Sequence, residues 1–278
     1  MCLAFVLIML GAWSSEATSR SLQDALAYGR YEQWIARYGR VYNDINEKED
    51  RFKIFKENEA YVESSNKDGN KLYKLSLNQF ADLTNEEFTA SRNRFLGHEC
   101  STKTTTFKYE NVTVPATMDW RKKGAEVVRP FQQWELWKES LSLQLANYPY
   151  TAADGTCNAK KAAGHAAKIT GHEDVPANSE SALLKAVANQ PISVAIDASG
   201  YDFQLYSSGV FTGTCGTELD HGVTAVGYGV NADGTKYWLV KNSWGEQWGE
   251  EGYIRMQRDV AAPEGLCGIA MEASYPTV

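Results

Sequence analysis

The sequence has no excess of positive charge. Its 28 Lys and Arg residues are outnumbered by 35 Asp and Glu residues, which gives a formal net charge of -7 at pH 7. Proteins bind a phosphate backbone through clustered Lys and Arg, so an acidic chain offers no extended surface for nucleic acid. We therefore expect no nucleic-acid partner and interpret the charge as that of a solvated acidic surface.

Long apolar runs are also lacking. The run Leu3–Leu10 is too short to cross a bilayer, and no later run is long enough to anchor the chain in a membrane. Small residues follow it at Ala17-Thr18-Ser19, although no Lys or Arg precedes it. We predict that residues 1–19 form a secretory signal peptide. A buried core strand or a wrongly assigned start of the chain is the alternative.

Cysteine is sparse. The chain has five: Cys2, Cys100, Cys157, Cys215 and Cys267. Removal of the signal peptide would leave four, which allow three pairings. A bridge between Cys215 and Cys267 would close a loop of roughly 50 residues and contribute roughly 4 kcal/mol on the chain-entropy model. The residues alone leave the pairing open.

What the sequence does have is a long helical stripe. Six residues at spacings of 4, 4, 3, 4 and 4 fall along one side of a helix of about five turns. They are Glu47, Arg51, Phe55, Asn58, Val62 and Asn66. An earlier helix carries Tyr31, Trp34 and Tyr38 on one face. Periodicity alone indicates amphipathic helices with ordinary packing faces.

The same stripe resembles a known signature. Its order is similar to the Glu-Arg-Phe-Asn-Ile-Asn pattern of papain-like cysteine protease propeptides, with Val62 where Ile is usual. Residues 78–82, Asn-Gln-Phe-Ala-Asp, resemble the second propeptide motif, with Ser76 where a Gly is expected. The resemblance implies that residues 20–96 fold as a small helical inhibitor domain. In such precursors this domain runs through the active-site cleft in the direction opposite to substrate.

A linker and a second domain are expected to follow. Residues 97–113 are rich in Thr, Ser and Lys and lack hydrophobic periodicity, so we predict a linker that is processed near its end. It holds one N-x-T sequon, Asn111-Val112-Thr113, a tripeptide common enough by chance to add little. Residues 114–121 resemble the start of a mature papain-like domain, which would span residues 114–278.

The second half of the chain alternates helical and strand patterns. A helix is predicted over Ser179–Asn189, with Pro191 just past its end. Four β-branched or aromatic runs predict strands, and Asp233-Gly234 between two of them predicts a hairpin. The predicted strands are Ile192–Ile196, Val223–Tyr228, Lys236–Lys241 and Tyr253–Met256.

Two polar residues resemble catalytic positions of the papain family. The resemblance makes His221 the acid/base and Asn242 its orienting partner, with Trp244 shielding their hydrogen bond from water. An isolated His-Gly pair is more often structural, so the assignment depends on the family order of the surrounding motifs. His98, His165 and His172 lack such a context and are interpreted as surface residues.

The sequence lacks the nucleophile that this resemblance calls for. A Gln-Gly-x-Cys-Gly-x-Cys-Trp segment should lie between Trp120 and Asn147, but residues 126–146 contain no cysteine and do not resemble the family. Gln132 and Gln133 lack the flanking Gly and Cys of an oxyanion hole. A frameshift, an aberrant splice or a faulty gene model is the hypothesis for its loss.

The remaining cysteines offer no replacement. By resemblance Cys215 and Cys267 form a family disulfide, and the usual partner of Cys157 lies in the lost segment. Cys157 and the linker residue Cys100 are then spare thiols. Neither stands at a recognisable helix N-terminus, where the dipole favours a thiolate, so we expect no substitute nucleophile.

The predicted fold class is α+β. It comprises a helical propeptide domain followed by a truncated papain-like domain that keeps the β-rich right-hand half and lacks most of the helical left-hand half. An ill-defined connection is expected over residues 126–145, where Trp134 and Trp137 could form a makeshift helix. By resemblance, the S2 substrate pocket would draw on Ala195, Leu219, Gly222 and Glu272.

The function implied by the resemblance is that of a papain-family cysteine endopeptidase precursor, inactive for want of Cys and Gln. The alternatives are a non-catalytic inhibitor of related cysteine proteases and a truncated product without function. We expect no cofactor or metal, a monomer, protein or peptide substrates if active, and no membrane partner. The expected location is the secretory pathway, ending in the vacuole, the lysosome or outside the cell.

Overall fold

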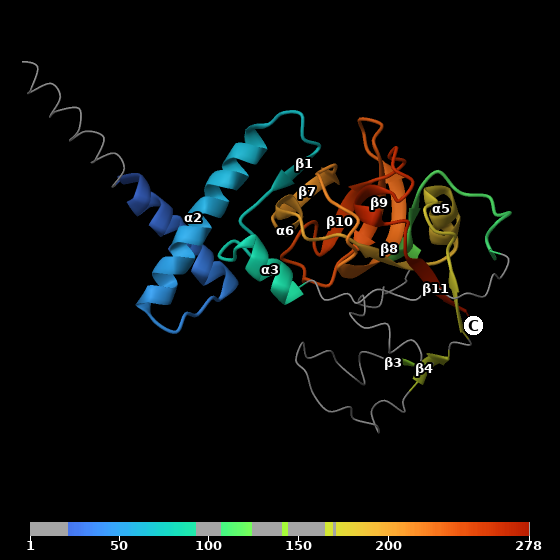
Figure 1. Ribbon diagram of the computed structural model, residues 1–278, viewed down its shortest axis with the longest axis horizontal. Helices are drawn as coiled ribbons and strands as arrows, with labels where there is room; N and C mark the ends of the chain where they lie inside the picture. The colour runs from blue at the N-terminus through green and yellow to red at the C-terminus, as the bar shows by residue number, and fades with distance from the viewer. Residues whose placement is uncertain (1–21, 93–106, 124–140, 144–164, 169–170, 278) are drawn as a thin grey trace, which may run out of the picture. The chain divides into compact units, whose positions relative to one another are not determined.

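The computed structural model describes residues 22–92, 107–123, 141–143, 165–168 and 171–277, which form two compact units (Figure 1). Unit 1 contains the described residues up to Gly69 together with Ser76–Thr84. Unit 2 contains Asn70–Leu75 and the described residues from Asn85 onward. The compact units therefore cut across the predicted propeptide range of 20–96, whose boundaries stay a prediction.

Unit 1 is a pair of helices closed by a loop. Residues 22–38 form the first helix, and α2 (Ile45–Lys67) follows it. Asp44 caps the N-terminus of α2, and its side chain accepts the Glu47 N–H at 2.9 Å. The two predicted apolar faces meet in a core of Tyr31, Trp34, Phe55 and Ala81, all buried. Their burial removes the largest apolar side chains of both helices from water, which stabilises the pair.

Polar signature residues bind the loop of unit 1 to α2. Asn58 is 1% exposed, and its Nδ2 donates to the carbonyl oxygens of Ala81 at 2.7 Å and Leu83 at 3.1 Å. Arg51 Nη1 donates to the carbonyl oxygen of Asp82 at 3.2 Å. The predicted stripe therefore acts as a set of loop-binding contacts as well as a packing face.

Unit 2 is built on a mixed sheet. Among the described residues its strand order is β1-β7-β10-β9-β8-β6-β11-β5, and β2 pairs with β8. The strands are β1 (Tyr73–Leu75), β2 (Met118–Asp119), β5 (Gly171–Asp174), β6 (Ile192–Ile196), β7 (Tyr206–Phe211), β8 (His221–Val230), β9 (Lys236–Lys241), β10 (Tyr253–Gln257) and β11 (Ala273–Thr277). All four predicted strands are confirmed, with small shifts at their ends.

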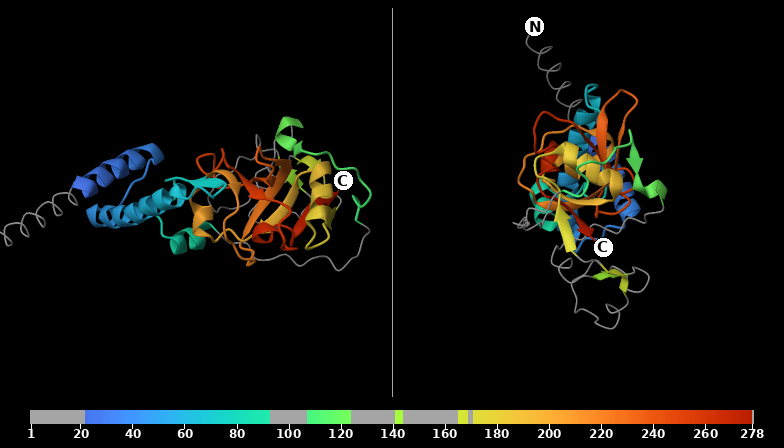
Figure 2. Two further views of the ribbon diagram at one scale, coloured as in Figure 1. Left: turned by 90° about the horizontal axis from the view of Figure 1, so that it is seen from above. Right: turned by 90° about the vertical axis from the view of Figure 1, so that its right-hand side faces the viewer.

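Short helices accompany this sheet. They are α3 (Asn85–Arg92), the 3-10 helix Trp120–Lys123, α5 (Glu180–Asn189), α6 (Tyr201–Gln204) and the 3-10 helix Leu266–Gly268. The predicted helix α5 is confirmed: Ser179 Oγ accepts the Ala182 N–H at 3.2 Å, and the helix contacts β8 (Figure 2).

A second, two-stranded sheet falls partly in the predicted ill-defined connection. β3 (Leu141–Leu143) pairs with β4 (His165–Lys168), so part of the connection has regular backbone structure. The remainder of residues 126–146, including Trp134 and Trp137, lies outside the described residues. The coarse prediction of an α+β fold with a large sheet and helices is confirmed.

Candidate active site

The central feature of unit 2 is a buried imidazole–amide pair. β8 and β9 are antiparallel, with Thr224 opposite Lys241, so the start of β8 lies beside the end of β9. His221 opens β8 and Asn242 follows β9, and His221 Nε2 lies 2.8 Å from Asn242 Oδ1. The two residues are 2% and 4% exposed. The structure therefore brings together two residues that the sequence placed 21 positions apart.

The hydrogen bonds of Asn242 fix the tautomer of the imidazole. Asn242 Oδ1 also accepts the backbone N–H of Ser243 at 2.7 Å, which identifies this atom as the amide oxygen. An amide oxygen only accepts, so His221 Nε2 must carry the proton. In the neutral ring the lone pair then stands at Nδ1, which is the atom that could take a proton from a nucleophile.

Burial makes this imidazole a weak base. Desolvation lowers the pKa of His221 to about 4, and the hydrogen bond to Asn242 opposes that shift only in part. Trp244, which is 6% exposed, stacks on the ring with centroids 4.7 Å apart. Among the described residues no carboxylate pairs with the ring, and at this pKa it is neutral at the mildly acidic pH at which cysteine proteases form their ion pair.

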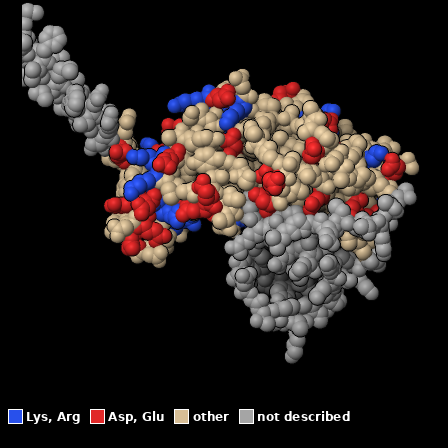
Figure 3. Space-filling model, viewed as in Figure 1, with Lys and Arg blue, Asp and Glu red and all other residues tan. Residues whose placement is uncertain are grey.

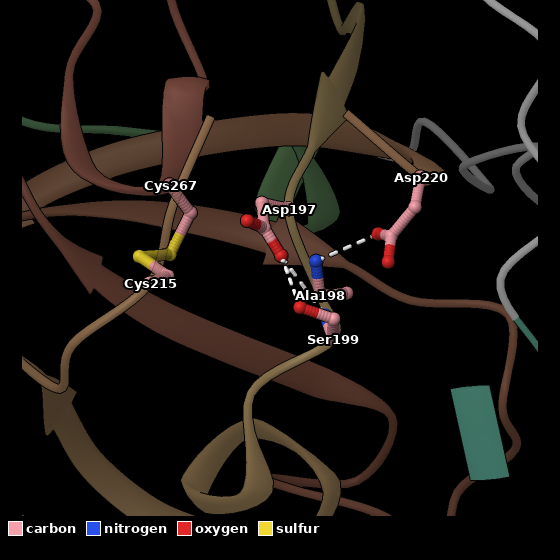
Figure 4. Close-up of a disulfide and its surroundings, with 6 residues drawn as sticks. All are labelled: Asp197, Ala198, Ser199, Cys215, Asp220 and Cys267. Atoms are coloured by element: carbon pink, nitrogen blue, oxygen red, sulfur yellow. Dashed lines mark hydrogen bonds between the residues drawn. A yellow bond between two sulfur atoms is a disulfide. The ribbon is translucent and has the colours of Figure 1, made fainter. Parts of the chain in front are cut away.

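A disulfide stands beside the strand ends that carry the pair. Cys215 and Cys267 are joined by an S–S bond of 2.05 Å, with their Cα atoms 5.1 Å apart (Figure 4). The carbonyl oxygen of Cys267 accepts the Asp197 N–H at 2.9 Å. The disulfide is thereby connected to the end of β6, the strand that pairs with the start of β8.

Two buried or half-buried carboxylates complete this support, and sequence reasoning did not single them out. Asp220 Oδ1 accepts the Ala198 N–H at 2.8 Å, which ties the residue before His221 to the end of β6 (Figure 4). Asp197 Oδ1 accepts from the N–H and Oγ of Ser199 at 3.1 and 2.6 Å. These contacts hold the backbone that positions His221.

Helix α3 covers Trp244, the residue that stacks on the His221 ring. Sequence reasoning also missed this role. Phe88 is fully buried, and its ring meets Trp244 edge-on with centroids 5.0 Å apart. Asn85 Nδ2 donates to the carbonyl oxygen of Ser199 at 3.0 Å and to Gln204 Oε1 at 3.1 Å. The only sequence signal was one aromatic residue in a short polar helix, which does not identify its partner.

Strand β1, like α3, belongs to the predicted propeptide range and makes its contacts within unit 2. It pairs antiparallel with β7, with Tyr73 opposite Gly209. Gly209 has φ +91, and a Cβ there would stand 2.3 Å from the Leu72 carbonyl oxygen, so glycine is required. Tyr73 Oη and Lys71 Nζ both bind Asp202 Oδ2.

Three of the four residues predicted for the S2 pocket, Ala195, Gly222 and Glu272, are neighbours in unit 2. Ala195 pairs with Gly222 across β6 and β8, and its N–H donates to the Glu272 carbonyl oxygen at 3.3 Å. Leu219 is half-buried, and its Cδ2 stands 2.7 Å from where a Cβ of Gly268 would lie. A separate surface hollow contains none of them; it is lined by Asn178–Ser181, Asp259, Val260, Ala262 and Pro263.

The remaining candidates are only partly visible. His172 is exposed, as predicted for a surface histidine. Cys2, Cys100, Cys157 and His98, together with Gln132 and Gln133, lie outside the described residues, and the side chain of His165 is not described.

A two-unit α+β protein with this disulfide and a buried His–Asn pair defines the class of papain-like proteins. The chain belongs to the papain family: the family model described as "Papain family cysteine protease" matches residues 117–277. The model described as "Cathepsin propeptide inhibitor domain (I29)" matches residues 31–88. The family predicted from the sequence is confirmed, and the chain is a papain-family cysteine protease precursor with its propeptide domain.

Curated relatives and solved structures cover both parts. The chain is 44% identical to a vignain of Ricinus communis over 339 residues, covering 99% of this chain and 92% of the relative. It is 40% identical to the senescence-specific cysteine protease SAG12 of Arabidopsis thaliana over 336 residues, covering 99% and 97%. A recombinant stem bromelain precursor has TM-score 0.80 and 38% identity, covering 91% and 99%.

These sequence alignments are longer than the chain itself. At 339 and 336 residues they exceed its 278 residues by 61 and 58. Each relative therefore has stretches that this chain does not supply.

Three further features are those of the part of the chain that the structure describes. None of its helices is long and apolar enough to cross a membrane. It contains no group of three His, Cys, Asp or Glu side chains arranged to hold a metal ion. On the face drawn in Figure 3, its Lys and Arg side chains are interspersed with Asp and Glu.

Proposed function

We propose that this chain is a papain-family precursor that does not cleave peptide bonds. The observation that carries the proposal is the pairing of His221 with Asn242 in a chain none of whose five cysteines stands in the sequence context of the family's nucleophile. Two of five cysteines are joined in a disulfide, and Cys2, Cys100 and Cys157 stand in sequence contexts unlike the family's nucleophile. Thiol hydrolysis needs a thiolate beside the imidazole.

The proposal assigns remnant catalytic roles to the pair. His221 Nδ1 is the position from which a base would act, and Asn242 orients the ring through Nε2. An adjacent thiolate would favour the protonated ring and raise the pKa of His221 from its present value of about 4. Without that anion, burial keeps the ring neutral, and Nδ1 has no thiol from which to take a proton.

A truncated left-hand half is part of the same proposal. The 58 to 61 extra alignment residues support the loss of a segment that would include the nucleophile and the oxyanion Gln. We infer that a frameshift, an aberrant splice or a faulty gene model removed it. Sequencing the transcript tests this origin, and an uninterrupted Cys-Trp segment in the transcript would refute it.

Activity is tested on the purified full chain with a dipeptidyl fluorogenic substrate at pH 5–7. We expect no turnover above that of His221→Ala. An epoxide probe for cysteine proteases should label no thiol in the wild type that it leaves unlabelled in His221→Ala. Turnover abolished by His221→Ala, or an adduct at Cys100 or Cys157 that needs His221, would overturn the proposal.

The second candidate is inhibition of a related cysteine protease in trans. The complete propeptide contacts of Asn58 and Arg51 in unit 1 favour it. The contacts of Phe88 with Trp244 and of Tyr73 with β7 oppose it, because both residues would have to leave these contacts within unit 2 to bind another protease. Micromolar or tighter inhibition of an active relative, weakened by Asn58→Ala, would support it; no inhibition would exclude it.

Location, specificity and assembly complete the proposal. The chain would enter the secretory pathway through residues 1–19 and reach the vacuole, the lysosome or the outside of the cell as a monomer. If any activity exists, its substrates are proteins or peptides that place a side chain against Ala195, Leu219, Gly222 and Glu272. Failure of the chain to accumulate in the producing cell would favour a truncated product without function.

A further inference from the structure

The segment that enters unit 2 from the predicted linker is held at several points. Tyr109 is 8% exposed, and its ring lies 5.2 Å from that of Tyr275 on β11. The carbonyl oxygen of Glu110 accepts from Lys185 Nζ of α5 at 2.7 Å. Further on, the Pro115 carbonyl oxygen accepts from Tyr228 Oη of β8 at 3.0 Å. Residues 107–115 therefore have a defined path along unit 2.

Between these anchors the chain presents a sequon to solvent. Asn111 and Thr113 are exposed, whereas Val112 is half-buried, and its N–H donates to the Tyr109 carbonyl oxygen at 3.4 Å in a turn. Within the described residues, no hydrogen bond or ion pair uses the side chain of Asn111 or Thr113. A large group on the Asn111 amide would therefore project into solvent without breaking a contact of the fold.

We propose that Asn111 is a site of N-linked glycosylation. The residue types fit the chemistry, because the sequon is Asn-Val-Thr with no Pro at its middle position, and the Thr113 hydroxyl stands at the required place. Such tripeptides also occur by chance, but this one lies in an exposed turn, and the contacts that hold the turn come from neighbouring residues. Its position is therefore accessible for modification.

The co-substrate is a lipid-pyrophosphate-linked oligosaccharide of the secretory pathway. The Asn111 amide nitrogen forms a C–N bond to the first sugar's anomeric carbon and loses one proton. The C–O bond from that carbon to the pyrophosphate breaks, and the lipid pyrophosphate leaves with the bonding electron pair. No oxidant or reductant is needed.

The inference rests on the proposed entry into the secretory pathway, and the test separates the two. The full chain is expressed in plant secretory cells with its own residues 1–19 and, in parallel, with an established secretion signal replacing them. Peptide N-glycosidase should produce one decrease in apparent mass and convert Asn111 to Asp in the tryptic peptide. A single step is expected because Asn111-Val112-Thr113 is the one sequon of the sequence.

Matched variants make the test specific to this site. Asn111→Gln and Thr113→Ala should abolish the mass step, whereas Thr113→Ser keeps the hydroxyl and should retain it. Asn111→Gln should leave the urea midpoint of the unglycosylated chain unchanged, because the side chain makes no described contact.

The outcomes of the two expressions are distinguishable. Glycan found only behind the replacement signal would support the site and refute entry directed by residues 1–19. Secreted chain that carries no glycan at Asn111 would overturn the inference, whatever its activity.

Discussion

Unit 1 and unit 2 each carry a family signature, but the signature residues of unit 1 hold its fold together, whereas those of unit 2 form a catalytic type of pair. In unit 1, Asn58 and Arg51 bind backbone carbonyl oxygens of the loop at residues 81–83, so their contacts are complete within the fold. In unit 2, His221 and Asn242 bind each other through Nε2 and Oδ1, and Nδ1 of the ring is left for a reacting group outside the pair. A folding signature is complete when its contacts form, whereas a catalytic one also needs the reacting atom.

The largest expected effect on stability comes from removing the disulfide of unit 2. Cys215→Ala combined with Cys267→Ala opens a loop with a sequence separation of 52 residues. Unit 2 should lose roughly 4 kcal/mol of its free energy of unfolding on the chain-entropy model, while unit 1 is unchanged. Hydrogen exchange of peptides from each unit in increasing urea measures this. Equal losses in both units would show that they unfold together.

A smaller effect concerns pH and the buried ring of unit 2. Burial lowers the pKa of His221 from 6.5 to about 4, so between these values the unfolded chain binds a proton that the folded chain does not. The stability of unit 2 should therefore be full above pH 6.5, fall by roughly 3 kcal/mol towards pH 4, and level off below. Urea midpoints at pH 4–7 measure the fall.

His221→Gln is the control for that window. It keeps an N–H donor for Asn242 but does not titrate, so its remaining pH dependence reports the other groups. An identical fall in both proteins would contradict the assignment to His221.

Asn58→Ala should mainly affect unit 1. The substitution leaves the Ala81 and Leu83 carbonyl oxygens without the buried amide that donates to them. The expected cost is about 2 kcal/mol in the free energy of unfolding of unit 1, with unit 2 unchanged. Exchange protection of residues 78–84 should fall first, and undiminished protection there would show that the loop is held by other contacts.

The smallest effect is expected on the exposed side of α2. Lys53 and Asp50 form an ion pair of 2.7 Å, with side chains 68% and 71% exposed. Lys53→Ala should leave the urea midpoint of unit 1 unchanged, because solvent screens such exposed pairs. A loss as large as that of Asn58→Ala would erase the distinction between the buried and exposed faces of the helix.

Local sequence signals were sufficient for several elements of both units. The six-residue stripe of α2, the Ser179 cap of α5 and the β-branched runs of β6 and β9 each follow from neighbouring residues. Strand β7 was missed because Ser207, Ser208 and Gly209 interrupt its apolar pattern. It forms through its pairing with β1 and β10, and Gly209 admits the close approach of Leu72.

The sequence by itself determined the family, the charge balance and the inventory of thiols, because these depend only on which residues occur and in what order. The tertiary structure decided that His221 meets Asn242, that Phe88 covers Trp244 and that Asn111 faces solvent. Each of these depends on strand pairing and packing between distant segments. Such contacts depend on the whole fold, because the burial of a side chain and its distance from another are set by three-dimensional packing and not by neighbouring positions in the chain.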